Sequence, residues 1–248
     1  MQGRIMPPAI IRVKTIFAGD EFVSEKDLLE DKSISYPTYY LKNFHCYPDG
    51  NLSWKATSEA EAATSVMIIR AIPAAKNLDD AIKVLRGNWL QAIEDHYLAH
   101  SGNRFLLRKS RASTCHKDKQ AAAAGKGREK PIRWVHALGE NTQLPAASFD
   151  IVSLAYVIHE CPQDATKALL KEAPGGTVAL TDNSPKSKII QNLPPALFTL
   201  MKASEPWMDE YYSMDLENLM CEVGFTNVKS QLTDPRHMTA TGTVPCYI

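Results

Sequence analysis

Two histidines one helical turn apart are the first residues whose spacing could do chemistry. His96 and His100 stand four positions apart in a predicted helix, with Glu94 close by, so two imidazoles share one face and could hold a metal ion. No third ligand is evident in the sequence. The alternative, two ordinary histidines on the helix surface, is favoured, and no metal site is predicted.

Three further polar residues stand at the ends of predicted strands. His159 and Asp182 come at the carboxyl ends of two apolar runs, and His237 stands just before a third. They are candidates for a general base or for substrate contacts. Each has a structural alternative: His159 caps the next helix, Asp182 begins a turn with Asn183-Ser184-Pro185, and His237 closes a hairpin. Both interpretations stay open.

A basic segment, Arg104 to Lys130, carries nine lysines and arginines against Asp118 and Glu129. Because no aromatic side chain follows Phe105 to stack on a base, we expect a solvated linker rather than a nucleic-acid interface. Gly125-Lys126-Gly127 lacks the serine or threonine and the preceding strand of a P-loop.

The N-terminal part, residues 1–102, is predicted to be a helical and hairpin extension. Turn residues Pro48-Asp49-Gly50 indicate a hairpin over residues 43–54. Ser58 and Glu61 form a capping-box pattern for a helix that stops before Pro73. A second helix begins after Asn77 and ends at Ser101-Gly102. Its predicted buried face consists of Leu78, Ile82, Leu85, Trp89 and Ile93.

After Lys130, apolar runs of strand length alternate with helical segments, which is typical of an α/β domain. The predicted strands cover residues 132–138, 149–157, 177–182, 227–232 and 238–244, and the predicted helices residues 165–173 and 211–223. The turn Asp234-Pro235-Arg236-His237 joins the last two strands, and Gly224 ends the second helix.

The order of motifs in this part resembles a known family. Leu144-Pro145 and Ser148-Phe149-Asp150 precede a strand, His159-Glu160 follows it, and Pro174-Gly175-Gly176 introduces the strand that ends in Asp182. This order is similar to the class I S-adenosylmethionine-dependent methyltransferases of the type 11 group, relatives of quinone C-methyltransferases. The resemblance implies a Rossmann-like methyltransferase sheet in residues 132–248.

The tail of the chain resembles a plant subgroup of these proteins, through Glu205-Pro206-Trp207, Tyr211-Tyr212, Gly224-Phe225 and the turn 234–237. Trp207, Tyr211 and Tyr212 are expected to serve packing.

The resemblance implies S-adenosylmethionine as the cofactor and a small-molecule acceptor as the substrate. Glu140 and Asn141 fall where the family presents an acidic side chain and its neighbour to the adenine edge. Ala155 and Tyr156, at the carboxyl end of the central strand, are expected to line the cofactor crevice, in agreement with the general rule for open α/β sheets.

The glycine-rich turn after the family's first strand has no counterpart in this chain. Two strands, two helices and their connections need roughly 40 residues, and residues 103–131 are fewer. We therefore expect a sheet that lacks its first two strands, with residues 103–131 as a linker. Three functions stay open: a methyltransferase, a non-catalytic relic or binding protein, and nucleic-acid binding through the basic segment.

Composition sets outer bounds on these functions. The chain has 28 lysines and arginines and 28 aspartates and glutamates, so its net charge gives no attraction for nucleic acid or anionic membranes. Five scattered cysteines with no paired motif indicate reduced thiols in an intracellular protein, cytoplasmic or plastid. No apolar run is long enough to span a bilayer.

Overall fold

The computed structural model describes residues 31–50, 52–100, 112–114, 133–173 and 176–244 of the 248. The chain forms two compact units. The first comprises Met1–Met67 with Ala112–Ala137, and the second Ile68–Arg111 with Leu138–Ile248. The predicted boundaries near residues 102 and 131 lie outside the described residues and stay predictions. No helix in the described ranges has the length and apolar character to cross a membrane.

The first unit holds a short 3-10 helix, η1 (Thr38–Leu41), most of helix α3 (Trp54–Ala71), and two parallel strands, β1 (Ala112–Thr114) and β2 (Arg133–Val135). Strand β1 lies inside the segment predicted as a linker, residues 103–131. Most of that segment is outside the described residues, so the linker stays a prediction.

Two predictions for the start of α3 need correction. The backbone does turn at Pro48-Asp49-Gly50, where the Gly50 N–H donates to the Tyr47 carbonyl at 3.0 Å. The antiparallel bridge, however, joins Phe44 to Tyr47 and so lies before this turn and not across it, unlike the predicted hairpin. The helix then begins at Trp54, four residues before Ser58, so the capping-box prediction is wrong. Ser53 takes that role, since its Oγ accepts a hydrogen bond from the Ala56 N–H at 3.2 Å.

Helix α4 (Leu78–His100) agrees with its prediction. The Asn77 side chain accepts from the Asp80 N–H at 2.9 Å and caps the helix, and the predicted face is turned inward, with Leu85 and Ile93 buried. The histidine prediction is wrong for one residue: His100 is exposed, but His96 is buried.

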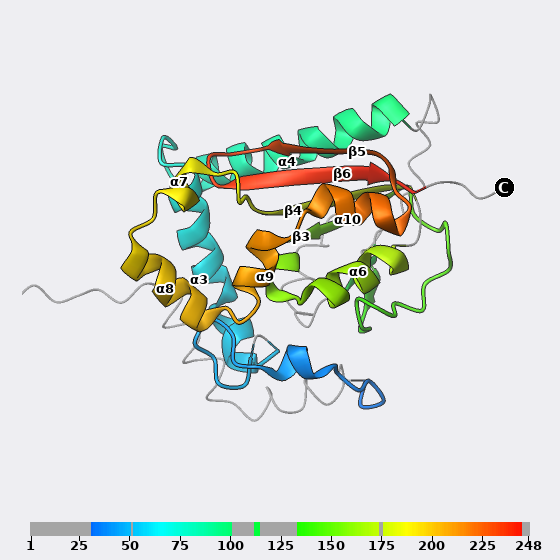
Figure 1. The fold of residues 1–248 in the computed structure, drawn as a ribbon, viewed down its shortest axis with the longest axis horizontal. Coiled ribbons are helices and arrows are strands. Elements are labelled where there is room, and N and C mark those ends of the chain that lie inside the picture. Colours follow the sequence, from blue (N-terminus) through cyan, green and yellow to red (C-terminus); the bar gives the residue numbers. More distant parts are fainter. Residues whose placement is uncertain (1–30, 51, 101–111, 115–132, 174–175, 245–248) are drawn as a thin grey trace, which may run out of the picture. The chain divides into compact units, whose positions relative to one another are not determined.

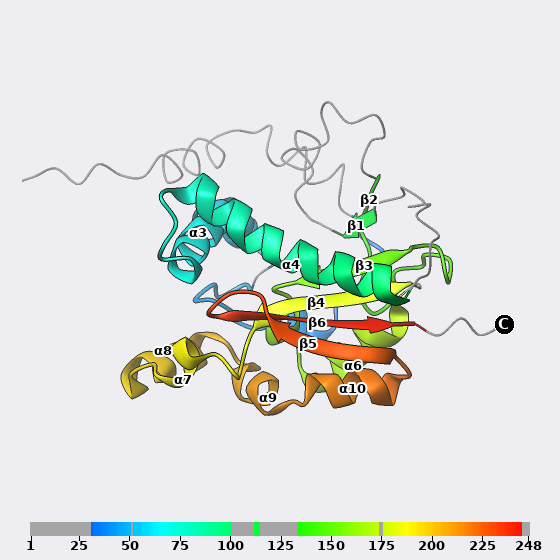
Figure 2. The same ribbon diagram turned by 90° about the horizontal axis from the view of Figure 1, so that it is seen from above.

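The second unit is built on a four-stranded sheet in the order β3-β4-β6-β5. The strands are β3 (Ile151–Ala155), β4 (Thr177–Asn183), β5 (Thr226–Leu232) and β6 (His237–Thr243). β3 and β4 are parallel, whereas β6 is antiparallel to both β4 and β5. Helix α4 covers one face, and α6 (Gln163–Glu172), α9 (Met208–Ser213) and α10 (Leu216–Val223) cover the other (Figures 1 and 2). The α/β prediction is confirmed.

The core lies between the sheet and the second group of helices. Val178, Leu180, Met238 and Ala240 project from β4 and β6 against side chains of α10 such as Met220. Two short helices, α7 (Lys188–Gln191) and α8 (Pro195–Ser204), precede α9. The segments expected to hold the first two strands of the family are largely outside the described residues, so the incomplete sheet stays a prediction.

The predicted helix 211–223 is two helices. α9 ends at Ser213 and α10 begins at Leu216, because Asp215 interrupts the run and caps the second helix: its Oδ1 accepts from the Asn218 N–H at 3.0 Å. Gly224, with φ 108°, ends α10 as predicted.

Candidate functional site

The carboxyl edge of the parallel strands gathers most of the candidate residues. Ala155, the last residue of β3, pairs with Thr181 of β4, and Tyr156 follows it with φ 59°. The Tyr156 N–H donates to the Thr181 carbonyl at 2.8 Å, which fixes this left-handed turn beside the strand end. Positive φ at a bulky residue is uncommon and turns the Tyr156 side chain away from the run of the strand.

His159 and Asp182 form a buried pair at this edge. His159 lies in the 3-10 helix η2 (Ile158–Glu160). Its ring Nδ1 is 2.7 Å from Asp182 Oδ1, and its backbone N–H donates to Asp182 Oδ2 at 3.2 Å. Burial opposes the charged imidazole, but the carboxylate charge and hydrogen bond of Asp182 outweigh it. They raise the pKa of His159 to about 9. His159 is therefore an imidazolium at neutral pH.

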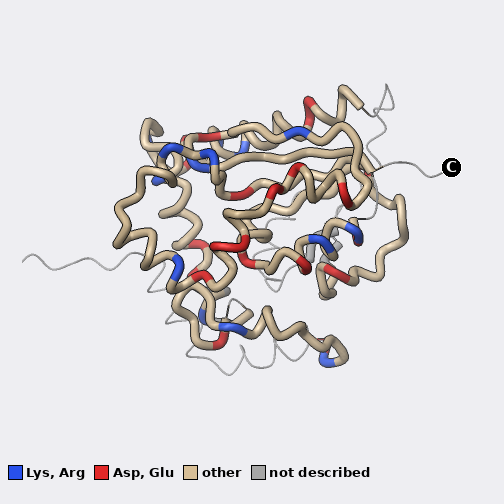
Figure 3. Tube along the Cα trace, viewed as in Figure 1, with Lys and Arg blue, Asp and Glu red and all other residues tan. Residues whose placement is uncertain are grey.

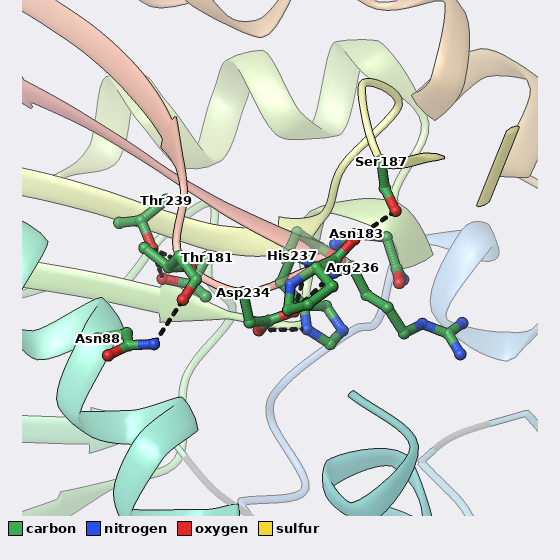
Figure 4. A network of polar contacts seen from close by, with 11 residues as sticks. Asn88, Thr181, Asn183, Ser187, Asp234, Arg236, His237 and Thr239 are labelled. Carbon is green, nitrogen blue, oxygen red and sulfur yellow. Dashed lines mark hydrogen bonds and ion pairs between the residues drawn. The ribbon is translucent and has the colours of Figure 1, made fainter. Parts of the chain in front are cut away.

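His237 and Asp234 form a second buried pair in the β5–β6 turn (Figure 4). His237 Nδ1 is 2.7 Å from Asp234 Oδ2, and Asp234 Oδ1 accepts from the N–H groups of Arg236 and His237 at 2.7 and 2.9 Å. The turn itself is the predicted one. The carboxylate holds both the backbone of the turn and the tautomer of the ring.

The two pairs lie on opposite faces of the sheet. Asn183 is directly opposite His237 in the β4–β6 ladder, and Asp182 is opposite Met238. Residues opposite each other share a face, and successive residues alternate. Met238 belongs to the core shared with α10, so Asp182 projects to that face, whereas His237 projects toward α4.

Tyr156 lies against the second pair. Its ring is 5.1 Å from the His237 ring and 5.9 Å from the ring of Trp89 in α4. Burial raises the pKa of Tyr156, and the charges of Asp234 and Asp182 raise it further. Both carboxylates therefore act on the one phenol. Its Oη is buried and has no hydrogen-bond partner among the described residues.

Tyr211 and Tyr212 of α9 line the edge on the side of His159. The Tyr211 ring is 6.2 Å from the His159 ring, and its hydroxyl donates to the Asn183 carbonyl. Burial raises the pKa of Tyr212, and Glu205 and Asp182 raise it further. The buried Tyr212 Oη and Arg236 Nε have no hydrogen-bond partner in the described part of the chain.

The charge at this edge is negative on balance. Glu160 Oε1 lies 3.8 Å from His159 Nε2, and the charge of Glu205 also acts on this ring. Three carboxylates, counting Asp182, thus surround one imidazolium. Figure 3 shows further acidic residues in α9 and α10. Such a surrounding favours a cationic ligand.

Glu140 and Asn141 lie in a different turn. Leu138 and Asn141 form an isolated bridge, and the next residue, Thr142, donates its N–H and Oγ1 to Glu172 Oε1, both at 3.0 Å. Glu172 ends α6, the helix that leads back to the start of β4. The structure thus places His159 with Asp182 on one face of this edge and Tyr156 with His237 on the other. It gives no contact between these residues and the 140–141 turn within the described ranges.

Asp234, Trp89 and Arg236 were missed from the sequence. The spacing of Asp234 and His237, three residues apart around a proline, is a signal that could have indicated the pair. Trp89 was predicted only as a core residue, because nothing in a helical pattern tells which part of the sheet a side chain will meet.

Comparison with known proteins places the family resemblance on one segment. Residues 107–178 match the model of the methyltransferase domain, which is less than a third of the chain. The chain has no match among curated proteins. Strands β3 and the start of β4 lie in the matched segment, so this part is methyltransferase-like in sequence.

Several solved structures resemble part of this chain at low TM-scores. PigF with SAH is 16% identical with a TM-score of 0.39, and the match covers 55% of this chain and 48% of that one. A SAM-dependent methyltransferase from Thermotoga maritima, described as a possible histamine N-methyltransferase, is 17% identical with a TM-score of 0.42, covering 72% and 99%. Human N-acetylserotonin methyltransferase in complex with SAM is 17% identical with a TM-score of 0.35, covering 49% and 36%.

The chain spans 48% and 39% of the length of the first two structural relatives. All these TM-scores are below 0.5, so the similarities do not determine the function of this chain.

Proposed function

We propose that the second unit carries an S-adenosylmethionine-dependent methyltransferase site at the carboxyl edge of β3 and β4, acting on a small-molecule acceptor. The observation that carries this proposal is the cluster of Asp182, Glu160 and Glu205 around one imidazolium, next to a segment that matches a methyltransferase domain. S-adenosylmethionine, when bound, supplies an electrophilic methyl group on a sulfonium cation.

The residues at the edge fit the sulfonium end of this cofactor. Carboxylates in excess favour a positive charge, and the ring of Tyr212, on which the charges of Glu205 and Asp182 act, offers cation–π contact. Gly50, Gly176 and Gly242 do not fit the nucleoside end, because a Cβ at each of them would meet the protein's own atoms within 3.0 Å. For the adenine we propose Glu140 and Asn141, which rests on the family resemblance.

His159 is the proposed proton acceptor. Asp182 engages Nδ1, so the second nitrogen, Nε2, is the one that can take a proton from the acceptor. Because the pKa of His159 is about 9, the neutral form is scarce at pH 7 and grows as the pH rises. His237, held by Asp234, is the second candidate for this role.

The unpaired donors indicate how an acceptor could be oriented. Tyr156 Oη, Tyr212 Oη and Arg236 Nε are buried without partners among the described residues, and buried polar atoms are rarely left unpaired. We propose that oxygen atoms of the acceptor form hydrogen bonds with at least one of them.

Membership of the plant subgroup stays a prediction.

An alternative is a binding protein that keeps the scaffold without catalysis. The protonated state of His159 at neutral pH favours it, because an imidazolium in an ion pair stabilises the fold without acting as a base. Binding of S-adenosylmethionine without methyl transfer would distinguish the binding protein from the enzyme.

The test is a calorimetric titration of the chain with S-adenosylmethionine and, separately, with S-adenosylhomocysteine, which lacks the sulfonium charge. We expect S-adenosylmethionine to bind more tightly, and Glu160→Gln and Glu205→Gln to weaken only that ligand, by roughly threefold to tenfold for a change of about 1 kcal/mol. Glu222→Gln, on α10 and paired with Lys167, is the matched control. No heat and no thermal stabilisation at millimolar ligand would contradict the proposal.

A further inference from the structure

A small cavity lies between the C-terminal half of α4 and the hairpin β5–β6, away from the proposed methyltransferase site. Its volume is about 90 Å³. From α4 it is lined by Ala92, Asp95, His96, Ala99 and His100, and from the strands by Lys229, Gln231, Thr239 and Thr241. Both histidines of the four-residue spacing thus face one cavity.

The two imidazoles are close to each other and differently anchored. Their ring centroids are 4.6 Å apart. His96 is 6% exposed, and its Nε2 lies 3.0 Å from Thr243 Oγ1 of β6. When Nε2–H donates to this hydroxyl, the lone pair rests on Nδ1, and the ring orientation is fixed, as in metal sites whose ligand is held by a second contact. His100 is exposed and can adjust to a shared ligand.

The charges around the cavity act on a cation in both directions. His100 is in the last turn of α4, where the helix dipole favours a cation, and Asp95 adds a carboxylate to the cavity. The ammonium group of Lys229 opposes a cation there.

We propose that His96 and His100 bind one divalent transition-metal ion of the zinc class, with water completing the coordination. Imidazole nitrogens suit zinc, copper and nickel, and the spacing of four residues on a helix brings two of them to one ion. Lys229 limits the affinity, because its ammonium group lies on the wall of the same cavity.

The test is a zinc titration of the metal-free full-length chain against a colorimetric chelator, followed by the visible spectrum of the Co²⁺ form. His100→Ala is the main variant, since His100 is exposed and its loss leaves the core intact. We expect it to weaken this zinc site at least about tenfold. Glu94→Ala, one exposed position outside the cavity on the same helix, is the control and should bind as the unaltered chain does.

Lys229→Met should change the zinc affinity in the direction opposite to His100→Ala. Removal of a cation from the cavity wall should tighten zinc binding several-fold and leave the Co²⁺ spectrum of a nitrogen-bound ion in place. Equal zinc affinity in the unaltered chain and in His100→Ala, or no binding by the unaltered chain at about millimolar zinc, would overturn the proposal.

Discussion

Asn183 and His237 face each other in the antiparallel ladder of β4 and β6, and this register divides two buried histidine–aspartate pairs between the two faces of one sheet. Asp182, one residue earlier, projects to the face of α9 and α10 and holds His159. His237 projects to the face of α4 and is held by Asp234. A shift of one residue in this ladder would exchange the two environments.

The His159–Asp182 pair should make stability depend on pH on the alkaline side. The folded-state pKa of His159, about 9, lies above its ordinary value of 6.5. Its contribution, about 3 kcal/mol, is therefore present below pH 6.5 and is lost as the pH rises through about 9. Urea unfolding between pH 6 and 10 checks this, and His159→Gln should flatten the profile. An unchanged slope in that variant would assign the loss to other groups.

Gly176 should be intolerant of a side chain. Its φ is 65°, and an added Cβ would lie 2.0 Å from the Asp150 carbonyl oxygen. Gly176→Ala is expected to lower the free energy of unfolding by at least about 2 kcal/mol. Gly87, in α4, has nothing within 4 Å of its Cβ position, so Gly87→Ala should raise the free energy by about 0.5–1 kcal/mol. Equal changes in the free energy of unfolding for Gly176→Ala and Gly87→Ala, measured by chemical denaturation, would contradict this prediction.

The break between α9 and α10 rests on one cap. Asp215→Ala removes the acceptor of the Asn218 N–H and should cost about 1 kcal/mol of unfolding free energy. Asp215→Asn keeps an acceptor oxygen and should cost less than half as much. A fused helix over residues 211–223, seen by NMR chemical shifts in the alanine variant, would mean that the cap alone sets the break.

Two tyrosines differ in what their hydroxyls bind. The Tyr211 hydroxyl donates to the Asn183 carbonyl, so Tyr211→Phe should cost about 1–2 kcal/mol. The Tyr156 hydroxyl is buried without a partner in the described structure, so Tyr156→Phe should leave thermal unfolding unchanged or raise its midpoint. A large loss in Tyr156→Phe would show that this hydroxyl has a bound partner in solution.

The apolar runs of strand length in the sequence predicted most of the strands of the second unit. The apolar runs at 149–157 and 177–182 contain β3 and β4, and Asp234-Pro235-Arg236-His237 was recognisable as a turn from its residue types alone. The break at Asp215 was not predicted, because Met214 and Leu216 continue the apolar pattern on both sides of it. Capping depends on the conformation that the chain adopts, and aspartate is also found within helices.

The candidate site could be predicted only in part, for a similar reason. Strand ends placed Tyr156, His159 and Asp182 at one edge of the sheet, since parallel strands end together. Which carboxylate holds which histidine depends on the ladder register and on the hairpin, and neither is visible in a residue pattern. The burial of His96 was also out of reach, because it depends on Thr243 of a strand 147 positions away.

The strand order has a consequence for synthesis on the ribosome. β6 lies between β4 and β5 although it is synthesised after both, so the sheet lacks this inner strand until residue 243 has left the exit tunnel. A nascent chain that stops before residue 237 leaves β5 unpaired and one edge of β4 exposed, which favours chaperone binding or degradation. Premature termination in the last strand should therefore remove the whole second unit from the cell, and not merely its final hairpin.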